Sequence, residues 1–117
     1  MLGRLSRFRG HNSLNAVYKY GKSVSSNNVS LKYLQLKSDK PARTAVVVSR
    51  KVSKKAVTRN RIRRRIYEQL RLKTAGNKLN SDLVITVYSD QLAAMAPADL
   101  SNTLDDLLNK SRVIEKK

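Results

Sequence analysis

The sequence predicts a single domain in which α-helices pack on a β-sheet, and three patterns indicate this. Val29, Leu31 and Tyr33 alternate with polar residues, as in a strand with one buried and one wet face. Residues 44–49 form a run rich in β-branched side chains, which favours a central strand buried on both faces. Apolar residues within 62–70 instead recur at the spacing of a helix that packs through one narrow stripe.

Length and composition fit one domain over residues 1–117, with residues 1–11 and 112–117 expected to be flexible ends. The chain contains no cysteine, which excludes disulfides and thiolate metal sites and fits a reducing compartment. No apolar run approaches the roughly 20 residues of a membrane span. The basic N-terminus lacks the apolar stretch of a secretion signal. We therefore expect a cytoplasmic protein without a membrane partner.

The first half of the chain is predicted to form a short helix followed by strands. Asn12 or Ser13 is expected to cap a helix that runs to Tyr20 and ends at Gly21 in a left-handed conformation. Residues 24–36 are predicted to form a strand, either continuous or broken in two by a Ser-Ser-Asn-Asn turn.

The second half is predicted to form a helix, a strand and a helix. The first helix covers about residues 57–73, follows a basic loop and ends at an Ala-Gly-Asn sequence. Residues 83–88 form a second buried strand, and the helix-length connection allows it to run parallel to 44–49. The last helix begins at Pro97, and its leucines recur at helical spacing from Leu100, so it is expected to cover the sheet.

The net charge of +17 is concentrated in one part of the chain. Residues 1–73 carry 20 Lys and Arg against two acids, whereas residues 74–117 carry five against six. Within residues 50–65, nine of sixteen are basic and none is acidic. A face that was merely solvated would be expected to carry compensating acids, so this pattern indicates a polyanion, with nucleic acid favoured. An anionic membrane is the main competitor, but the segment lacks the Trp-, Phe- and Leu-rich face of membrane-surface helices.

The chain offers little for self-contained catalysis. Its one histidine, His11, lies in a basic segment without a second positioned group for acid–base work. Asp105 and Asp106 are neighbours on a helix and diverge by about 100°, so they form no metal pair. The basic segment can bind phosphate, because Arg pairs with two phosphate oxygens and Asn60 adds a neutral hydrogen-bonding group. We therefore predict no catalytic residue and no small-molecule substrate.

One stretch of the basic segment closely resembles a known signature. It reads Val-Ser-Arg-Lys-Val from Val48 and then Ala-Val-x-Arg-Asn-Arg-Ile-Arg-Arg from Ala56. This order and spacing resemble the signature of the bacterial ribonuclease P protein subunit. The likeness extends over almost the whole chain, from the Arg-Phe-Arg opening at Arg7, through the helix end at Gly21, to the final strand and helix.

The resemblance implies an α+β two-layer sandwich in the order αβββαβα. Its four-stranded mixed sheet would contain an unusual left-handed β-α-β crossover. The resemblance also implies the protein subunit of an RNA-based endoribonuclease that removes the 5′ leader from precursor tRNA. The catalytic RNA and its bound Mg²⁺ would supply the chemistry, while the protein would bind that RNA and the single-stranded leader. Composition alone leaves open an alternative, a non-enzymatic RNA-binding module such as a small ribosomal protein.

Carried over position by position, the resemblance implies two groups of contact residues. Those expected to bind the RNA subunit are Arg50, Lys51, Lys54, Lys55, Arg59, Asn60, Arg61, Arg63 and Arg64. Those expected in the cleft for the leader are Phe8, Arg9, Leu14, Tyr18 and Arg65. The family usually carries two phenylalanines where Leu14 and Tyr18 stand, and a tyrosine common in its first strand aligns with Asn28. Tyr18 can still stack on a base, worth about 1–3 kcal/mol, whereas Leu14 offers apolar contact only.

Overall fold

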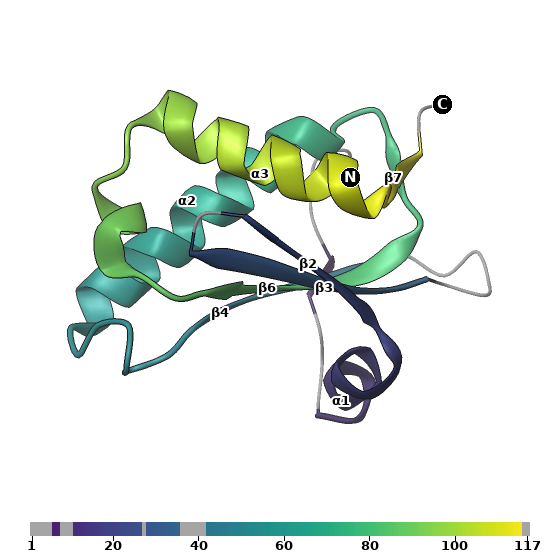
Figure 1. The fold of residues 1–117 in the computed structure, drawn as a ribbon, viewed down its shortest axis with the longest axis horizontal. Helices are drawn as coiled ribbons and strands as arrows, with labels where there is room; N and C mark the ends of the chain where they lie inside the picture. Colours follow the sequence, from purple (N-terminus) through teal and green to yellow (C-terminus); the bar gives the residue numbers. More distant parts are fainter. Residues whose placement is uncertain (1–5, 8–10, 27, 36–41, 116–117) are drawn as a thin grey trace.

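The computed structural model describes residues 6–7, 11–26, 28–35 and 42–115, with side chains between residues 15 and 114 of these ranges (Figure 1). Its elements are β1 (Ser6–Arg7), α1 (His11–Tyr20), β2 (Lys22–Ser26), β3 (Val29–Gln35), β4 (Arg43–Val48), α2 (Ala56–Thr74), β5 (Lys78–Leu79), β6 (Ser81–Val87), η1 (Asp90–Ala93), α3 (Pro97–Ser111) and β7 (Ile114–Glu115). The expected breaking of residues 24–36 into two strands is confirmed, as are the two long helices, whose bounds differ from the expected ones by a residue or so.

The main sheet has the strand order β1-β4-β6-β3-β2. β4 and β6 are parallel, as predicted from the length of the connection between them, whereas β3 is antiparallel to both β6 and β2. β1 adds only two residues to the outer edge of β4. The three helices and the four longer strands follow the order αβββαβα, so the predicted fold class is confirmed. The left-handed sense of the β4–α2–β6 crossover stays a prediction.

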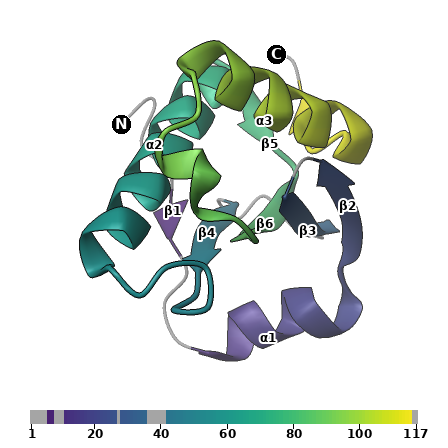
Figure 2. The same cartoon turned by 60° about the vertical axis from the view of Figure 1, so that its left-hand side comes forward.

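The helices lie in two places relative to the sheet. α2 and α3 cover one face, and α1 packs on the other, against β3 and β6 (Figures 1 and 2). The core fills the space between the sheet and the two long helices. The largest side chains buried there include Leu31, Leu83, Ile85, Ile62, Ile66, Leu70, Leu100, Leu104 and Leu107. The apolar stripes predicted for both helices therefore face the core.

β4 differs from the prediction that it is buried on both faces. Thr44, Val46 and Val48 are buried, but Ala45 and Val47 between them are only half-buried. Val46 and Val48 belong to the core beneath α2, so Ala45 and Val47, which alternate with them, point to the opposite face of the sheet. Burial on both faces is confirmed for β6, which lies between two long strands.

Gly21 does not end α1 in the left-handed conformation that we expected, since positive φ among the glycines of the described residues occurs only at Gly76, at 76°. The backbone N–H of Gly21 donates to the carbonyl of Val17 over 2.8 Å. A Cβ at Gly21 would lie 2.4 Å from that oxygen and 2.8 Å from the carbonyl oxygen of Tyr33. Glycine is therefore required here because α1 and β3 approach too closely for any side chain.

Several short elements were not predicted from the sequence. Ser6–Arg7 pairs with β4, and Ile114–Glu115 pairs with Lys78–Leu79, although both terminal pieces belong to segments expected to be flexible. Val57, in the first turn of α2, does not pack in the core, since its side chain is 78% exposed. Among the described helices, none combines the length and the apolar character needed to cross a membrane.

Candidate nucleic-acid interface

The loop before α2 is held against the start of that helix by hydrogen bonds. The N–H of Val52 donates to the carbonyl of Ser49 over 3.1 Å, which closes a turn directly after β4. The N–H of Lys55 donates to the Ser53 hydroxyl over 3.3 Å, and the Arg59 guanidinium donates to the Ser53 carbonyl over 2.9 Å. Arg59 therefore fixes the loop to the first turn of α2, in addition to carrying charge.

The N-terminus of α2 is strongly positive. Its capping residue, Lys55, provides no side-chain hydrogen bond, and the first turn contains no acidic residue. A helix N-terminus already carries about half a positive charge from its aligned peptide dipoles. The Lys and Arg side chains add to this field, so an anion is needed to offset the repulsion.

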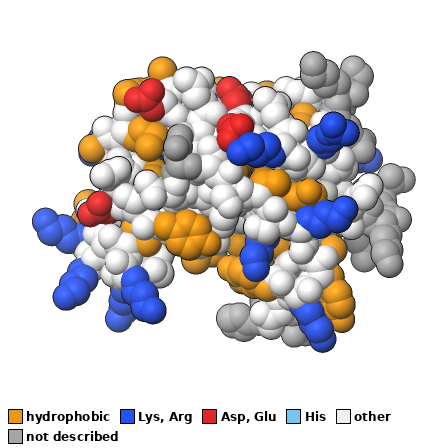
Figure 3. Space-filling model, in the orientation of Figure 1, with side chains coloured by type: hydrophobic (Ala, Val, Ile, Leu, Met, Phe, Trp, Pro, Cys, Tyr) orange, Lys and Arg blue, Asp and Glu red, His pale blue; other side chains and the backbone are white. Residues whose placement is uncertain are grey.

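We call the positively charged area formed by the loop and the outer side of α2 the basic surface. Its exposed members are Arg50, Lys51, Lys54, Lys55, Asn60, Arg61 and Arg64. Arg59 and Arg63 are half-buried at its edge. In Figure 3 basic side chains gather at the end of the molecule where α2 begins, whereas the acidic side chains in that view lie mostly over α3. The structure thus brings together all nine residues predicted to contact the RNA subunit.

Two pairs of side chains order the outer side of α2. The Arg63 guanidinium donates to the side-chain oxygen of Asn60, one turn earlier. Arg71 donates through two nitrogens to the Glu68 carboxylate. The hydrogen bond and the charge of Arg71 lower the pKa of Glu68, and Glu68 in turn raises the pKa of Arg71.

A hollow of about 480 Å³ borders the basic surface where α2 passes β4. It is lined by Val57, Asn60, Arg63, Arg64 and Tyr67. Its inner end is fixed, because the Tyr67 hydroxyl accepts a hydrogen bond from the N–H of Val46 over 3.2 Å. Guanidinium groups beside an aromatic ring are suited to a nucleotide, since they provide both phosphate contacts and a stacking plane.

The other face of the sheet carries the residues around Tyr18. Val17 is fully buried, whereas Tyr18 is 41% exposed, and the Lys32 amino group lies 5.1 Å from the centre of its ring. Tyr88 is 62% exposed, and its hydroxyl lies 3.0 Å from the Ser30 hydroxyl. The sequence predicted a wet face for Ser30 and Lys32, which is wrong for Ser30, because it is 7% exposed beneath Tyr88, and Lys32 is half-buried. Neither residue, nor Tyr88, was included in the predicted site.

The residues predicted for the leader cleft are not all brought together. Phe8 and Arg9 lie outside the described residues, as does the side chain of Leu14. Arg65 points to the far side of α2, where its guanidinium donates to the carbonyls of Leu92 and Met95. Arg65 therefore lies against η1, whereas α1 with Tyr18 packs on β3 and β6, so the structure does not bring these two residues together.

Asn28 occupies the turn between β2 and β3, with a φ of 62°. Large side chains rarely adopt this conformation, whereas Asn is among the residues enriched in it. The tyrosine that the resemblance implied for this position would be strained here. The β3 residue that lies beside the Tyr18 ring is instead Lys32.

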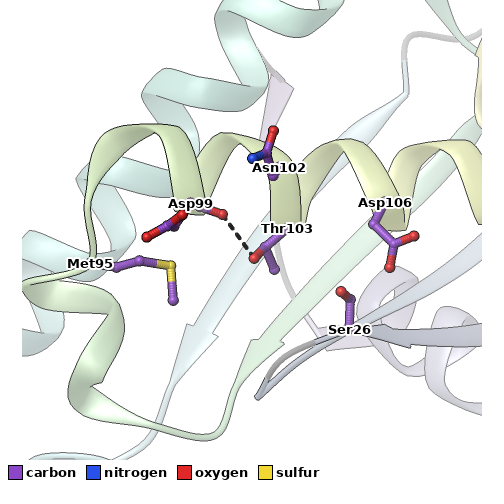
Figure 4. Close-up of a pocket in the computed structure, with 6 residues that line it drawn as sticks. All are labelled: Ser26, Met95, Asp99, Asn102, Thr103 and Asp106. Atoms are coloured by element: carbon purple, nitrogen blue, oxygen red, sulfur yellow. Dashed lines mark hydrogen bonds between the residues drawn. The ribbon is translucent and has the colours of Figure 1, made fainter.

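A second hollow, of about 450 Å³, lies between α3 and the end of β2 and is lined by acidic and neutral side chains (Figure 4). Asp99 and Asp106 point toward it, and Ser26 faces Asp106 from the strand. Hydrogen bonds from Lys110 and then from Ser26 lower the pKa of Asp106. Two carboxylates disfavour phosphate, so this side of the molecule is distinct from the basic surface. Within the described ranges, no group of three or more His, Cys, Asp or Glu side chains is arranged to hold a metal ion.

Comparison with known proteins points to one family. The family model described as Ribonuclease P matches residues 2–112. The ribonuclease P protein component of Synechococcus elongatus is 30% identical over 116 residues, covering 97% of this chain and 95% of that protein. The corresponding protein of Rippkaea orientalis is 34% identical over 117 residues, covering 97% and 91%.

Solved structures show the same fold. The RNase P protein of Staphylococcus aureus superimposes with a TM-score of 0.79 at 22% identity, covering 96% of this chain and 100% of that chain. The RNase P protein of Thermotoga maritima gives a TM-score of 0.75 at 23% identity, covering 90% and 96%. These relatives support the interpretation of the Arg-Asn-Arg signature over the ribosomal-protein alternative.

Proposed function

This chain belongs to the ribonuclease P protein family, and from that membership we propose how it works as the protein component of the endoribonuclease. The basic surface holds the catalytic RNA. The face of the sheet around Tyr18 holds the single-stranded 5′ leader of precursor tRNA. The RNA, with Mg²⁺ bound mainly to it, supplies the chemistry that hydrolyses the phosphodiester bond. The protein then acts in the cytoplasm by positioning and charge neutralisation, without a catalytic side chain.

The observation that carries this proposal is the ordered basic surface at the start of α2. Its loop is fixed by hydrogen bonds to Ser49 and Ser53, and its helix is anchored by the buried Ile62 and Ile66. The cations are therefore presented at fixed positions, which reduces the entropy lost when they bind phosphates. If six to eight of them neutralise phosphates, log K should fall against log salt with a slope of about −5 to −7.

The leader part of the proposal is supported by the residues on the opposite face of the sheet. Tyr18 offers a ring for stacking, worth about 1–3 kcal/mol per base. Lys32 lies over that ring and offers a cation for the adjacent phosphate. The half-buried Ala45 and Val47 add apolar surface on β4, the strand that leads into the basic loop.

Reconstitution with the catalytic RNA tests the proposal. We expect the full chain to increase cleavage of a precursor tRNA with a 5′ leader at low Mg²⁺ concentration. No increase would rule out the proposed function. Tyr18→Ala should reduce binding of leader-bearing substrate by about 5- to 150-fold, while binding of mature tRNA stays unchanged. Equal loss with both would show that Tyr18 only packs in the core.

A matched pair of variants tests the basic surface. Arg61→Ala combined with Arg64→Ala should weaken binding to the catalytic RNA and make the salt slope shallower by about 1 per residue. Both side chains are exposed, so folding should be intact. Lys110→Ala, on the acidic side of the molecule, removes a cation that is paired with Asp106 and should leave the slope unchanged. An equal slope for the double variant and the wild type would contradict the assignment.

A further inference from the structure

A third hollow lies between α2 and the beginning of α3, on the side of α2 away from β4. Its volume is about 380 Å³, enough for one nucleobase with part of its sugar. Its walls come from Arg61, Arg64, Arg65, Glu68, Pro97 and Leu100. Two of these residues belong to the basic surface, but Glu68, Pro97 and Leu100 do not, so its chemistry differs from that of a phosphate-binding face.

The hollow has a fixed apolar floor. Leu100 is 1% exposed and belongs to the core, and Pro97 sits in the first turn of α3. Arg65 holds the neighbouring segment in place, because its guanidinium donates to the carbonyls of Leu92 and Met95. A preformed floor of this kind favours binding of a flat apolar face, since little ordering is required on binding.

Glu68 is the acidic residue in an otherwise basic helix. Within residues 42–73 it is the only Asp or Glu. Arg71 orients it by donating to both carboxylate oxygens, with Nε 3.1 Å from Oε2. The same interaction lowers the pKa of Glu68, so the group is ionised and only accepts hydrogen bonds. This pairing uses the two lone pairs that point the same way, but it lies in solvent, since the side chain of Glu68 is 57% exposed and that of Arg71 45%. A surface ion pair of this kind is weak, so another pair of adjacent donors can replace Arg71.

The chemistry of this arrangement selects a base rather than a phosphate. A carboxylate repels phosphate, so Glu68 weakens the field of Arg61 and Arg64 for a purely electrostatic partner. It would instead be satisfied by two adjacent N–H donors. Among the four RNA bases, guanine alone presents such a pair on its Watson–Crick edge, at N1 and the 2-amino group. Unpaired bases are recognised in this way, with guanidinium planes stacked on the ring.

We propose that the hollow between α2 and α3 binds an unpaired guanine of the RNA partner. The Glu68 carboxylate accepts hydrogen bonds from N1 and the 2-amino group, in place of those from Arg71. The guanidinium of Arg61 or Arg64 stacks on the ring, and Pro97, above the buried Leu100, contacts its other face. This inference rests on the proposed function, since it requires a bound RNA, and it adds sequence recognition to a surface that otherwise reads only phosphates.

Chemical probing of the reconstituted complex tests the proposal. Kethoxal reacts with N1 and the 2-amino group of unpaired guanines, so it reports on the atoms that Glu68 would contact. We expect the wild-type chain to protect at least one unpaired guanine of the catalytic RNA, and Glu68→Ala to restore its reactivity. Asp105→Ala is the matched control: it removes one negative charge farther along α3, where Asp105 pairs with Lys73 and does not line the hollow, and it should leave protection unchanged.

Replacing the protected guanine by inosine, which lacks the 2-amino group, completes the test. Affinity should fall about tenfold for the wild type and by less than about twofold for Glu68→Ala. Unchanged protection in Glu68→Ala, or equal losses in both proteins, would overturn the inference. Salt-dependent binding and enhanced cleavage would persist in that case, so the proposed function would stand. Absence of any salt-dependent RNA binding would instead remove both.

Discussion

At the scale of single residues, the Tyr67 hydroxyl links α2 to the outer edge of β4. It accepts a hydrogen bond from the N–H of Val46 over 3.2 Å and donates to the carbonyl of Thr44 over 3.4 Å. β1 pairs with this edge only at Arg43 and Thr44. At Val46, where no strand pairs with the edge, the Tyr67 hydroxyl provides the hydrogen-bond acceptor instead. The ring of Tyr67 also lines the hollow beside the basic surface, so one side chain supports both the sheet and the site.

We predict that Tyr67→Phe lowers the free energy of unfolding by about 1–3 kcal/mol, because the N–H of Val46 loses its acceptor. Urea denaturation measures this change. Tyr88→Phe is the matched control, since it removes a hydroxyl that bonds to Ser30 from an exposed ring and should cost less. Equal effects of the two substitutions would show that the bond to β4 is unimportant.

Asp106 gives a pH-dependent prediction. Hydrogen bonds from Lys110 and, to a smaller extent, from Ser26 lower its pKa in the folded protein. A carboxyl group whose folded pKa is lowered adds stability above its unfolded pKa, and that stability is lost as the pH falls through the folded pKa. The wild type should therefore be more stable than Asp106→Asn at neutral pH, and the difference should begin to shrink as the pH falls below about 4, the ordinary pKa of an Asp carboxyl.

Chemical denaturation of both proteins at pH 7 and pH 2.5 gives the comparison. Introducing Lys110→Met into both proteins should reduce the difference at neutral pH, because it removes the main cause of the lowered pKa. A difference that is the same at both pH values would contradict this origin.

At the scale of elements, the junction of α1 with β2 and β3 depends on Gly21. Gly21→Ala would place a Cβ against backbone oxygens of Val17 and Tyr33, which cannot move as a flexible side chain could. We expect a loss of about 1–3 kcal/mol and a displacement of α1 from the sheet. Because Tyr18 lies on α1, binding of leader-bearing precursor tRNA should weaken as well.

Gly76→Ala separates this effect from a general loss of stability. Gly76 has a φ of 76° but open space around its Cα, so alanine is strained there without a collision. That variant should be destabilised and yet keep its preference for substrates with a leader. An equal loss of leader binding in both variants would show that α1 is not positioned by Gly21.

The elements that the sequence predicts well are those with their own periodicity. Ile62, Ile66 and Leu70 define α2, and the leucines from Leu100 onward define α3, because each helix hides one stripe whatever its partner. The two-residue strands β1, β5 and β7 have no such pattern. They exist because another segment lies alongside, and that depends on the assembled fold. The exposed face of β4 was missed for the same reason, since coverage by α1 is a tertiary property.

The candidate site shows the same division. The basic surface follows directly from the signature, since its residues are neighbours in sequence on one helix and its loop. The direction of Arg65 does not, because it depends on carbonyls of Leu92 and Met95 supplied by a 3₁₀ turn about 30 residues later. Lys32 meets Tyr18 only when β3 and α1 pack together, so their pairing could not be predicted from spacing.

At the scale of the whole molecule, a net charge of +17 opposes compaction through self-repulsion. Multivalent anions that bind the folded basic surface should therefore stabilise the protein by mass action. We predict that sodium sulfate raises the melting temperature more than sodium chloride at equal ionic strength. The excess should be smaller for the Arg61→Ala, Arg64→Ala double variant, while the general salting effect of sulfate acts equally on both proteins. Identical excesses would place the bound anion elsewhere.

The position of β6 has a consequence for how the chain is made. β6 separates β3 from β4, yet it is synthesised after both of them. At about 5–20 residues per second, it follows β4 from the ribosome by about 2 to 8 seconds, and α3 follows later still. Until then the nascent chain has two unpaired strand edges and no closed core. The basic helix α2 lies between β4 and β6 in sequence. It is therefore exposed to cellular RNA before the complete sheet that supports it has formed.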